Sequence, residues 1–217
     1  MKQKPINVDI NELREQANDT LHDSGWAPML TPFINGLDFD LIVEKLVSLV
    51  NAERRFTPRF KDIFNGFKEC KYDNLKCIIV GQDPYPQLGV ADGIAFSCSK
   101  KGKAEKSLQY ILKALGDEDG DVDLKRWSNQ GVLLINTAFT CEVNSIGSHY
   151  DLWKPFSKYI FENINRHKKD IPVILMGKKA ESWEIHLNNQ KIFKVTHPAS
   201  AAYRGGEWDC KNVFALV

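Results

Sequence analysis

The hydrophobic and polar positions divide the chain into a helical first part and a second part where short apolar runs alternate with helices. In the first part, apolar residues at helical spacing predict helices over residues 9–22 and 39–50, separated by a turn region at residues 25–28. Thr57-Pro58 is typical of a helix start, with threonine as N-cap and proline in the first turn. The apolar stripe of that short helix is expected to consist of Phe60, Ile63, Phe64 and Phe67.

In the second part, four apolar runs have the length and β-branched content of buried strands. They span residues 75–80, 131–136, 171–176 and 191–196. Helical patterns lie between them, over residues 107–115, 122–130, 153–166 and 178–187, and residues 212–217 resemble the start of another helix. This alternation predicts an α/β protein, a three-layer α/β/α arrangement with a central four-stranded, mostly parallel sheet. No repeat or linker interrupts it, so we expect a single domain over residues 1–217.

The composition restricts the classes of protein that are possible but does not indicate a function. Hydrophobic residues at 43% and charged residues at 26% are typical of globular proteins, and a net charge of +1 means that DNA binding would need local basic patches. The five cysteines form no Cys-x-x-Cys pair, which supports neither a zinc site nor a disulfide framework. No apolar run reaches membrane-spanning length. We therefore expect no metal, no cofactor and no membrane partner, and a cytoplasmic location, or a nuclear one in a eukaryote.

The most informative motif is Gly81-Gln82-Asp83-Pro84-Tyr85-Pro86, directly after the first predicted strand. A glycine and two prolines would hold the Asp83 carboxylate rigidly at the carboxyl end of that strand, where ligands bind in open α/β sheets. An aspartate before proline is also common as a helix N-cap or an ordinary turn residue. The motif alone therefore leaves both interpretations open.

Two further polar residues occupy equivalent positions. Asn136 ends the second predicted strand and His197 follows the fourth. Each residue alone is more often a turn or structural residue. Because parallel strands bring their carboxyl ends to one edge, the three side chains together predict a functional site.

Six segments in order resemble the uracil-DNA glycosylases, of the family 1 type. The Gly81–Pro86 run resembles their water-activating motif, which usually has histidine where this chain has Pro86. The other matching segments are Gly25-Trp26, Asp92-Gly93-Ile94-Ala95-Phe96-Ser97, the run from Gln130 to Thr137, Ser148-His149 with Trp153, and His197-Pro198 followed by Tyr203-Arg204-Gly205.

The resemblance implies hydrolysis of the N-glycosidic bond between uracil and deoxyribose, after the base is flipped into a pocket. Catalysis is assigned to Asp83, which would stabilise the cationic sugar and orient or deprotonate water, and to His197, whose neutral imidazole would hydrogen-bond uracil O2. The remaining pocket residues would be Gln82, Tyr85, Phe96 and Asn136. Asn136 can pair with uracil O4 and N3–H, Phe96 can stack on the base, Tyr85 would exclude the thymine methyl group, and Gln82 would support the pocket.

The resemblance also implies a DNA-binding surface. Its expected contacts are Ser107, Pro198, Ser200, Ala201, Tyr203 and Arg204. The loop at residues 99–106 carries four lysines against one acid, and is either a phosphate-binding loop or a solvated turn. The expected partner is uracil-containing DNA, single- or double-stranded, acted on by a monomer, with a protein inhibitor as a further candidate partner.

One departure concerns the segment that enters DNA, the family's intercalation loop. Ala201 stands where the family usually has a leucine that wedges into the space left by the extruded base. A methyl group fills less of that space, so we expect weaker flipping from intact duplex unless Tyr203 or Arg204 inserts instead. The loop at residues 99–106 also lacks the family's consecutive prolines.

Three functions remain in competition. The favoured one is a uracil-excising hydrolase. A glycosylase for another modified pyrimidine is the second, although Tyr85 and Asn136 describe a pocket for unmodified uracil. A catalytically silent DNA-binding or scaffolding relative is the third, and the presence of Asp83 and His197 argues against it.

Overall fold

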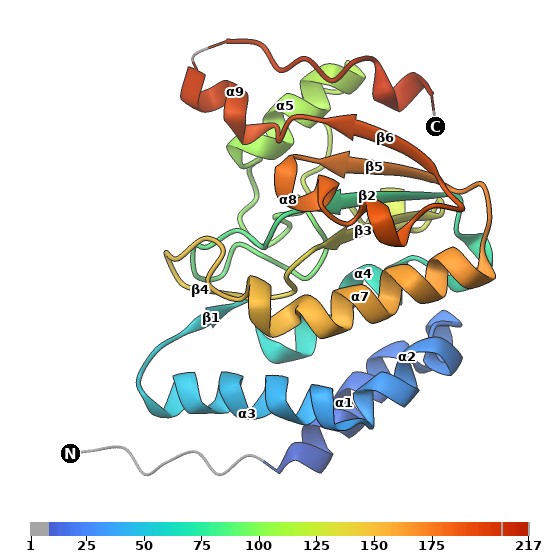
Figure 1. Ribbon diagram of the computed structural model, residues 1–217. Coiled ribbons are helices and arrows are strands. Elements are labelled where there is room, and N and C mark those ends of the chain that lie inside the picture. Colours follow the sequence, from blue (N-terminus) through green and yellow to red (C-terminus); the bar gives the residue numbers. More distant parts are fainter. Residues whose placement is uncertain (1–8, 205, 217) are drawn as a thin grey trace.

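A four-stranded sheet forms the centre of the molecule (Figure 1). The computed structural model describes residues 9–204 and 206–216, without the side chains of residues 202–204. The strands are β2 (Cys77–Gly81), β3 (Val132–Asn136), β5 (Pro172–Met176) and β6 (Lys191–Val195). They lie in the order β3-β2-β5-β6 and every neighbouring pair is parallel. The prediction of an α/β fold with four such strands is confirmed.

Helices cover both faces of this sheet, which gives three layers (Figure 1). One face carries α1 (Ile10–Leu21), α2 (Ala27–Ile34), α3 (Leu37–Asn51), α4 (Asn65–Glu69) and α7 (Tyr150–His167), and the other carries α5 (Lys106–Leu115) and α9 (Ala199–Arg204). Two further short helices are α6 (Lys125–Ser128) and α8 (Lys178–Glu181). Short 3₁₀ turns span His22–Ser24, Phe60–Asp62, Tyr72–Asn74, Glu184–His186 and Val213–Ala215. No helix among the described residues is long and apolar enough to cross a membrane.

Alternation along the strands divides the buried residues into two cores. In β2, Ile78 and Val80 face the layer of α1 to α4 and α7, whereas Cys77 and Ile79 face α5 and α9. This follows from the two-residue period of a strand. The larger core is rich in aromatic rings, and Phe156 of α7 lies at its centre.

Three expectations about single elements were wrong. Thr57 does not cap a helix, because it pairs with Cys141 in a two-stranded antiparallel sheet of β1 (Phe56–Thr57) and β4 (Cys141–Glu142). Residues 27 and 28 of the expected turn region are instead the first residues of α2. Pro28 is tolerated there because the first turn of a helix makes no hydrogen bond through its N–H groups, so the N–H that proline lacks is not needed. β6 is not a fully buried strand: it lies at the edge of the sheet and exposes Lys191 and Lys194.

Other boundaries were shorter than expected. The pattern at residues 122–130 forms only the four residues of α6, and that at residues 178–187 is divided between α8 and a 3₁₀ turn. Within residues 212–216, the described part of the last predicted helix, only the turn Val213–Ala215 forms. The single domain over residues 1–217 stays a prediction.

We predict that Phe156→Ala lowers the free energy of unfolding by about 3–5 kcal/mol, the range for removing a buried phenylalanine. Phe156 is fully buried, and its ring contacts those of Phe64, Phe139 and Trp153. Urea unfolding followed by circular dichroism measures the change. Leu37→Ala is the control: this side chain is 80% exposed and its removal should change stability by at most about 0.5 kcal/mol. Similar losses in both variants would contradict the assignment of the core.

Candidate active site

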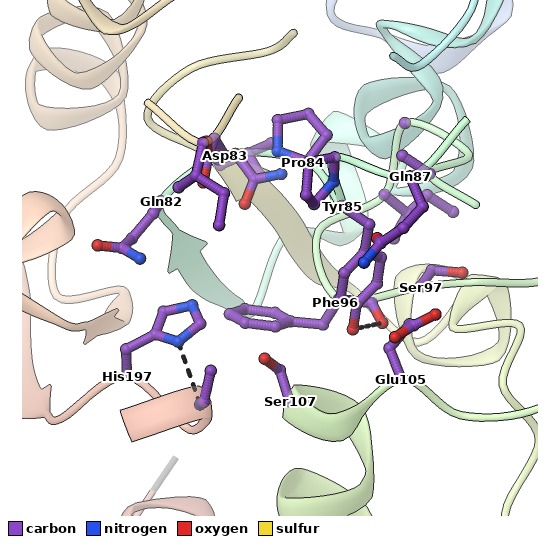
Figure 2. A pocket seen from close by; sticks show the side chains of 18 of the residues that line it. Gln82, Asp83, Pro84, Tyr85, Gln87, Phe96, Ser97, Glu105, Ser107 and His197 are labelled. Atoms are coloured by element: carbon purple, nitrogen blue, oxygen red, sulfur yellow. Dashed lines mark hydrogen bonds between the residues drawn. The ribbon is translucent and has the colours of Figure 1, made fainter. Parts of the chain in front are cut away.

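The carboxyl edge of the sheet holds a cavity of about 680 Å³ (Figure 2). All six residues expected to catalyse or to bind uracil line this one cavity: Gln82, Asp83, Tyr85, Phe96, Asn136 and His197. They come from β2, β3, β6 and the loops that follow them. The structure therefore brings together groups that are far apart in the sequence, as parallel strands are expected to do.

Gly81 allows two of these groups to approach each other. It pairs in register with Asn136, the last residue of β3. A Cβ atom at Gly81 would collide with Asn136 Oδ1 and would lie 3.1 Å from Cζ of the Phe96 ring. Only glycine leaves room for the amide and the ring to pack over the strand end.

The Asn136 amide is available to a ligand. The residue lines the cavity, and its side-chain amide has no hydrogen-bond partner among residues 9–204 and 206–216. One amide offers an acceptor and two donors. Asn136 can therefore bind a group that presents a donor and an acceptor side by side.

Asp83 is held in place from a distant loop. Its Oδ2 accepts a hydrogen bond of 2.6 Å from the backbone N–H of Gly147, and the Tyr150 hydroxyl interacts with the same carboxylate. Burial raises the pKa of Asp83, while the interactions with Gly147 and Tyr150 act in the opposite direction. A rigid carboxylate with a raised pKa is suited to act as a general base, which accepts a proton from a water molecule or orients that water.

The backbone around Asp83 is fixed to the end of β3. The carbonyl oxygen of Gln82 accepts hydrogen bonds from Thr137 Oγ1 at 2.6 Å and from the Ala138 N–H at 3.0 Å. The carbonyl of Pro86 accepts another from the Asn144 N–H at 2.9 Å. The carboxylate is thus anchored from both sides of its turn.

His197 has a defined tautomer when neutral. Its Nδ1 accepts a hydrogen bond of 3.2 Å from the Ala199 N–H, so the single proton of the neutral ring is on Nε2. Burial lowers the pKa of His197 to about 4. Gly177 packs against it so closely that a Cβ there would lie 2.9 Å from His197 Cβ. A neutral donor is therefore present at the cavity over a wide range of pH.

The aromatic side of the cavity consists of Phe96 and Tyr85. The rings of Phe96 and His197 lie 5.8 Å apart between centroids (Figure 2). The Tyr85 hydroxyl donates to the carbonyl oxygen of Phe96 at 3.0 Å, which fixes the tyrosine ring. Phe96 has a φ of 66°, a left-handed conformation that is unfavourable for a bulky side chain.

Asp92 stabilises this strained segment, a role that sequence reasoning missed. The carboxylate is only 3% exposed and accepts hydrogen bonds from the Ile94 N–H, the Ser97 hydroxyl, and both the N–H and the hydroxyl of Ser99. These bonds close the loop on both sides of Phe96. The two serines downstream of an aspartate were the only sequence signal.

The expected DNA contacts divide into three groups. Ser107 and Ser200 line the cavity. Pro198 and Ala201 are buried, and Ala201, 5% exposed, packs in the smaller core. Neither side chain reaches the surface in this conformation, and the expectation that the two contact DNA stays a prediction. Tyr203 and Arg204 belong to α9, but their side chains lie outside the described part of the chain.

The lysine-bearing loop is partly neutralised. Lys100 pairs with Asp62 at 2.5 Å and Lys101 pairs with Glu105. Lys103 and Lys106 are exposed and have no ion pair within the described part of the chain. Lys106 also lines the cavity, so it is the lysine best placed to meet a phosphate there.

No group of three or more metal-binding side chains occurs among residues 9–204 and 206–216. All five cysteines lie in the described part of the chain, and each has a free thiol.

Comparison with known proteins identifies the family. A family model described as the uracil DNA glycosylase superfamily matches residues 67–215, and the chain belongs to this superfamily. It is 35% identical over 192 residues to the uracil-DNA glycosylase of Amoebophilus asiaticus, covering 83% of this chain and 86% of that protein. Uracil-DNA glycosylase 1 of Listeria innocua is 37% identical over 171 residues, covering 74% and 77%. The crystal structure of mimivirus uracil-DNA glycosylase has the same fold, with a TM-score of 0.76, 24% identity and coverage of 88% and 71%.

We predict that Asp92→Ala lowers the free energy of unfolding by about 3 kcal/mol or more, because it leaves the N–H groups of Ile94 and Ser99 without partners. It should also weaken binding of free uracil, since Phe96 is no longer held. Urea unfolding and calorimetric titration with uracil measure the two effects. Asp121→Ala is the control, an exposed carboxylate that accepts one bond from the Asp123 N–H. Equal stability of the two variants would contradict the role of Asp92.

Proposed function

We propose that this protein excises uracil from DNA by hydrolysing the N-glycosidic bond after base flipping, leaving an abasic site. The observation that carries the proposal is the meeting of a carboxylate, an amide and an imidazole in one cavity: Asp83, Asn136 and His197. Family membership supports the same reaction.

Asp83 would act on the sugar side of the bond. As the bond breaks, positive charge develops on the deoxyribose, and an ionised carboxylate stabilises it and orients or deprotonates the attacking water. The hydrogen bond from Gly147 holds this carboxylate in one position, so it needs little rearrangement during the reaction.

The departing base would meet the other residues. The Nε2–H of neutral His197 is the donor for uracil O2, where negative charge accumulates. Asn136 pairs with O4 and N3–H, and cytosine, with the opposite donor and acceptor pattern, leaves these groups unpaired. Phe96 stacks on the base and the fixed Tyr85 ring excludes a 5-methyl group. Gln82 lines the same cavity and contributes through its backbone.

The partner of the enzyme is uracil-containing DNA, and Ser107, Ser200 and Lys106, which line the cavity, are the candidate phosphate contacts. A variant of the mimivirus enzyme was crystallised in complex with UGI, which supports a protein inhibitor as a candidate partner here. We further propose a monomer, a single domain, and a cytoplasmic location, the compartment of DNA in bacteria such as the curated relatives.

We predict that the protein releases free uracil and leaves abasic sites when incubated with a uracil-containing oligonucleotide in the presence of a chelator. Asp83→Asn should lose most of this rate, because an amide cannot take a proton from water, while DNA binding persists in a gel-shift assay. Leu37→Ala, remote from the cavity, is the matched control. Turnover in Asp83→Asn equal to the native rate would reject Asp83 as the base, and release of another pyrimidine instead of uracil would favour the second candidate function.

We predict a single acidic limb in the pH profile of kcat/KM. Asp83 must be ionised and His197 neutral, and both conditions hold above their pKa values. The pKa of Asp83 is raised above 3.8 and that of His197 is lowered to about 4, so activity falls on the acidic side, as the pH decreases through these two pKa values. His197→Gln should lower the plateau and should leave the part of the limb that belongs to Asp83. A further limb near 6.5 that disappears in His197→Gln would contradict the lowered pKa.

A further inference from the structure

An exposed isoleucine lies at the mouth of the cavity. Ile146 is 63% exposed and lines the same cavity as Asp83 and His197. It belongs to the loop between β4 and α7. Single exposed apolar residues are ordinary on protein surfaces, so exposure alone has no functional meaning. The position of Ile146 within this loop is what distinguishes it.

Hydrogen bonds within the loop and to the turn of Asp83 hold the loop that carries Ile146. The Asn144 N–H donates to the carbonyl of Pro86 at 2.9 Å, which connects the loop to the turn of Asp83. The Ser145 N–H donates to the carbonyl of Glu142 at 3.0 Å, and the Ser148 hydroxyl donates to the carbonyl of Ser145 at 2.8 Å. Ile146 is therefore presented from a fixed loop.

Gly147, the residue after Ile146, connects this loop to the Asp83 carboxylate. Gly147 has a φ of 78°, and its N–H donates to Asp83 Oδ2 at 2.6 Å. A Cβ at Gly147 would lie 2.8 Å from Cε2 of the Tyr150 ring. The exposed isoleucine and the hydrogen bond to the carboxylate are thus adjacent in one constrained turn.

The opposite rim offers no comparable side chain among those described. In Figure 1, α9 lies on the other side of the carboxyl edge of the sheet from the β4–α7 loop. Its Ala201 is packed in the smaller core, and Ser200 is the α9 side chain that reaches the cavity together with Ala199. Proteins that distort DNA frequently insert an apolar side chain between base steps, and extrusion of a nucleotide leaves such a gap in the stack.

We propose that Ile146 is this wedge: it enters the space that the flipped nucleotide leaves, from the β4–α7 loop rather than from α9. The proposal rests on the proposed function. Because Gly147 follows directly, insertion of Ile146 and placement of the Asp83 carboxylate occur in the same turn. Insertion of Ile146 into a duplex would then be coupled, through Gly147, to the position of the Asp83 carboxylate.

The test compares Ile146→Ala with the native protein on three oligonucleotides: single-stranded uracil, a U·A duplex and a U·G duplex. The ratio of single-strand to U·A kcat/KM should rise about tenfold or more, because unstacking and unpairing are needed only in the duplex. The U·G substrate should show a smaller rise, since a mispaired base is easier to extrude. Fluorescence of 2-aminopurine placed beside the uracil should show less base opening in Ile146→Ala.

Two matched variants distinguish the loss of a wedge from a general loss of activity. Ile146→Leu keeps an apolar side chain of similar volume and should restore the native ratio. Leu88 is also exposed, at 55%, but does not line the cavity, so Leu88→Ala should leave the ratio unchanged. An unchanged ratio in Ile146→Ala, or equal losses on single strands and duplexes, would overturn the proposal. A native protein that releases no uracil from any substrate would instead refute the proposed function.

Discussion

The site depends on the parallel register between β2 and β3. This pairing places Gly81 beside Asn136, and the missing side chain of Gly81 lets the Asn136 amide and the Phe96 ring occupy the same strand end. From this point the chain turns directly into Gln82 and Asp83, whose backbone is bonded to the residues after Asn136. A shift of one residue in this register would turn the amide to the opposite face of the sheet. The positions of these cavity residues therefore depend first on the pairing of β2 with β3 and only then on the loops.

Burial acts on the two ionisable groups of the cavity in opposite directions. It raises the pKa of Asp83 and lowers that of His197, because each charged form loses its hydration. The hydrogen bond from Gly147 limits the change at Asp83, and His197 has only the Ala199 N–H on its Nδ1. One environment thus produces a basic carboxylate and a neutral imidazole, the pair that cleavage of a bond between a sugar and a base requires.

Sequence patterns predicted the parts of the molecule that depend on local chemistry. The strands were found from their β-branched runs, and Asp83, Asn136 and His197 from their positions at strand ends. Gly147 was not found, because its bond to Asp83 spans 64 residues and a backbone N–H has no sequence signature. The burial of Ala201 was not found either, because alignment with a family position does not reveal which side of a short helix faces the core.

The ion pairs of the loop at residues 99–106 have a consequence for binding strength. Lys100 and Lys101 already pair with Asp62, which Arg59 shares, and with Glu105, which leaves Lys103 and Lys106 as the lysines of the loop that are free to displace counterions from a phosphate backbone. Each phosphate neutralised on a duplex contributes about 0.9 to the slope of log affinity against log salt concentration. The contribution of this loop to that slope is thus about half of what its four lysines suggest. Attachment to DNA should tolerate rising ionic strength better than the composition of the loop implies.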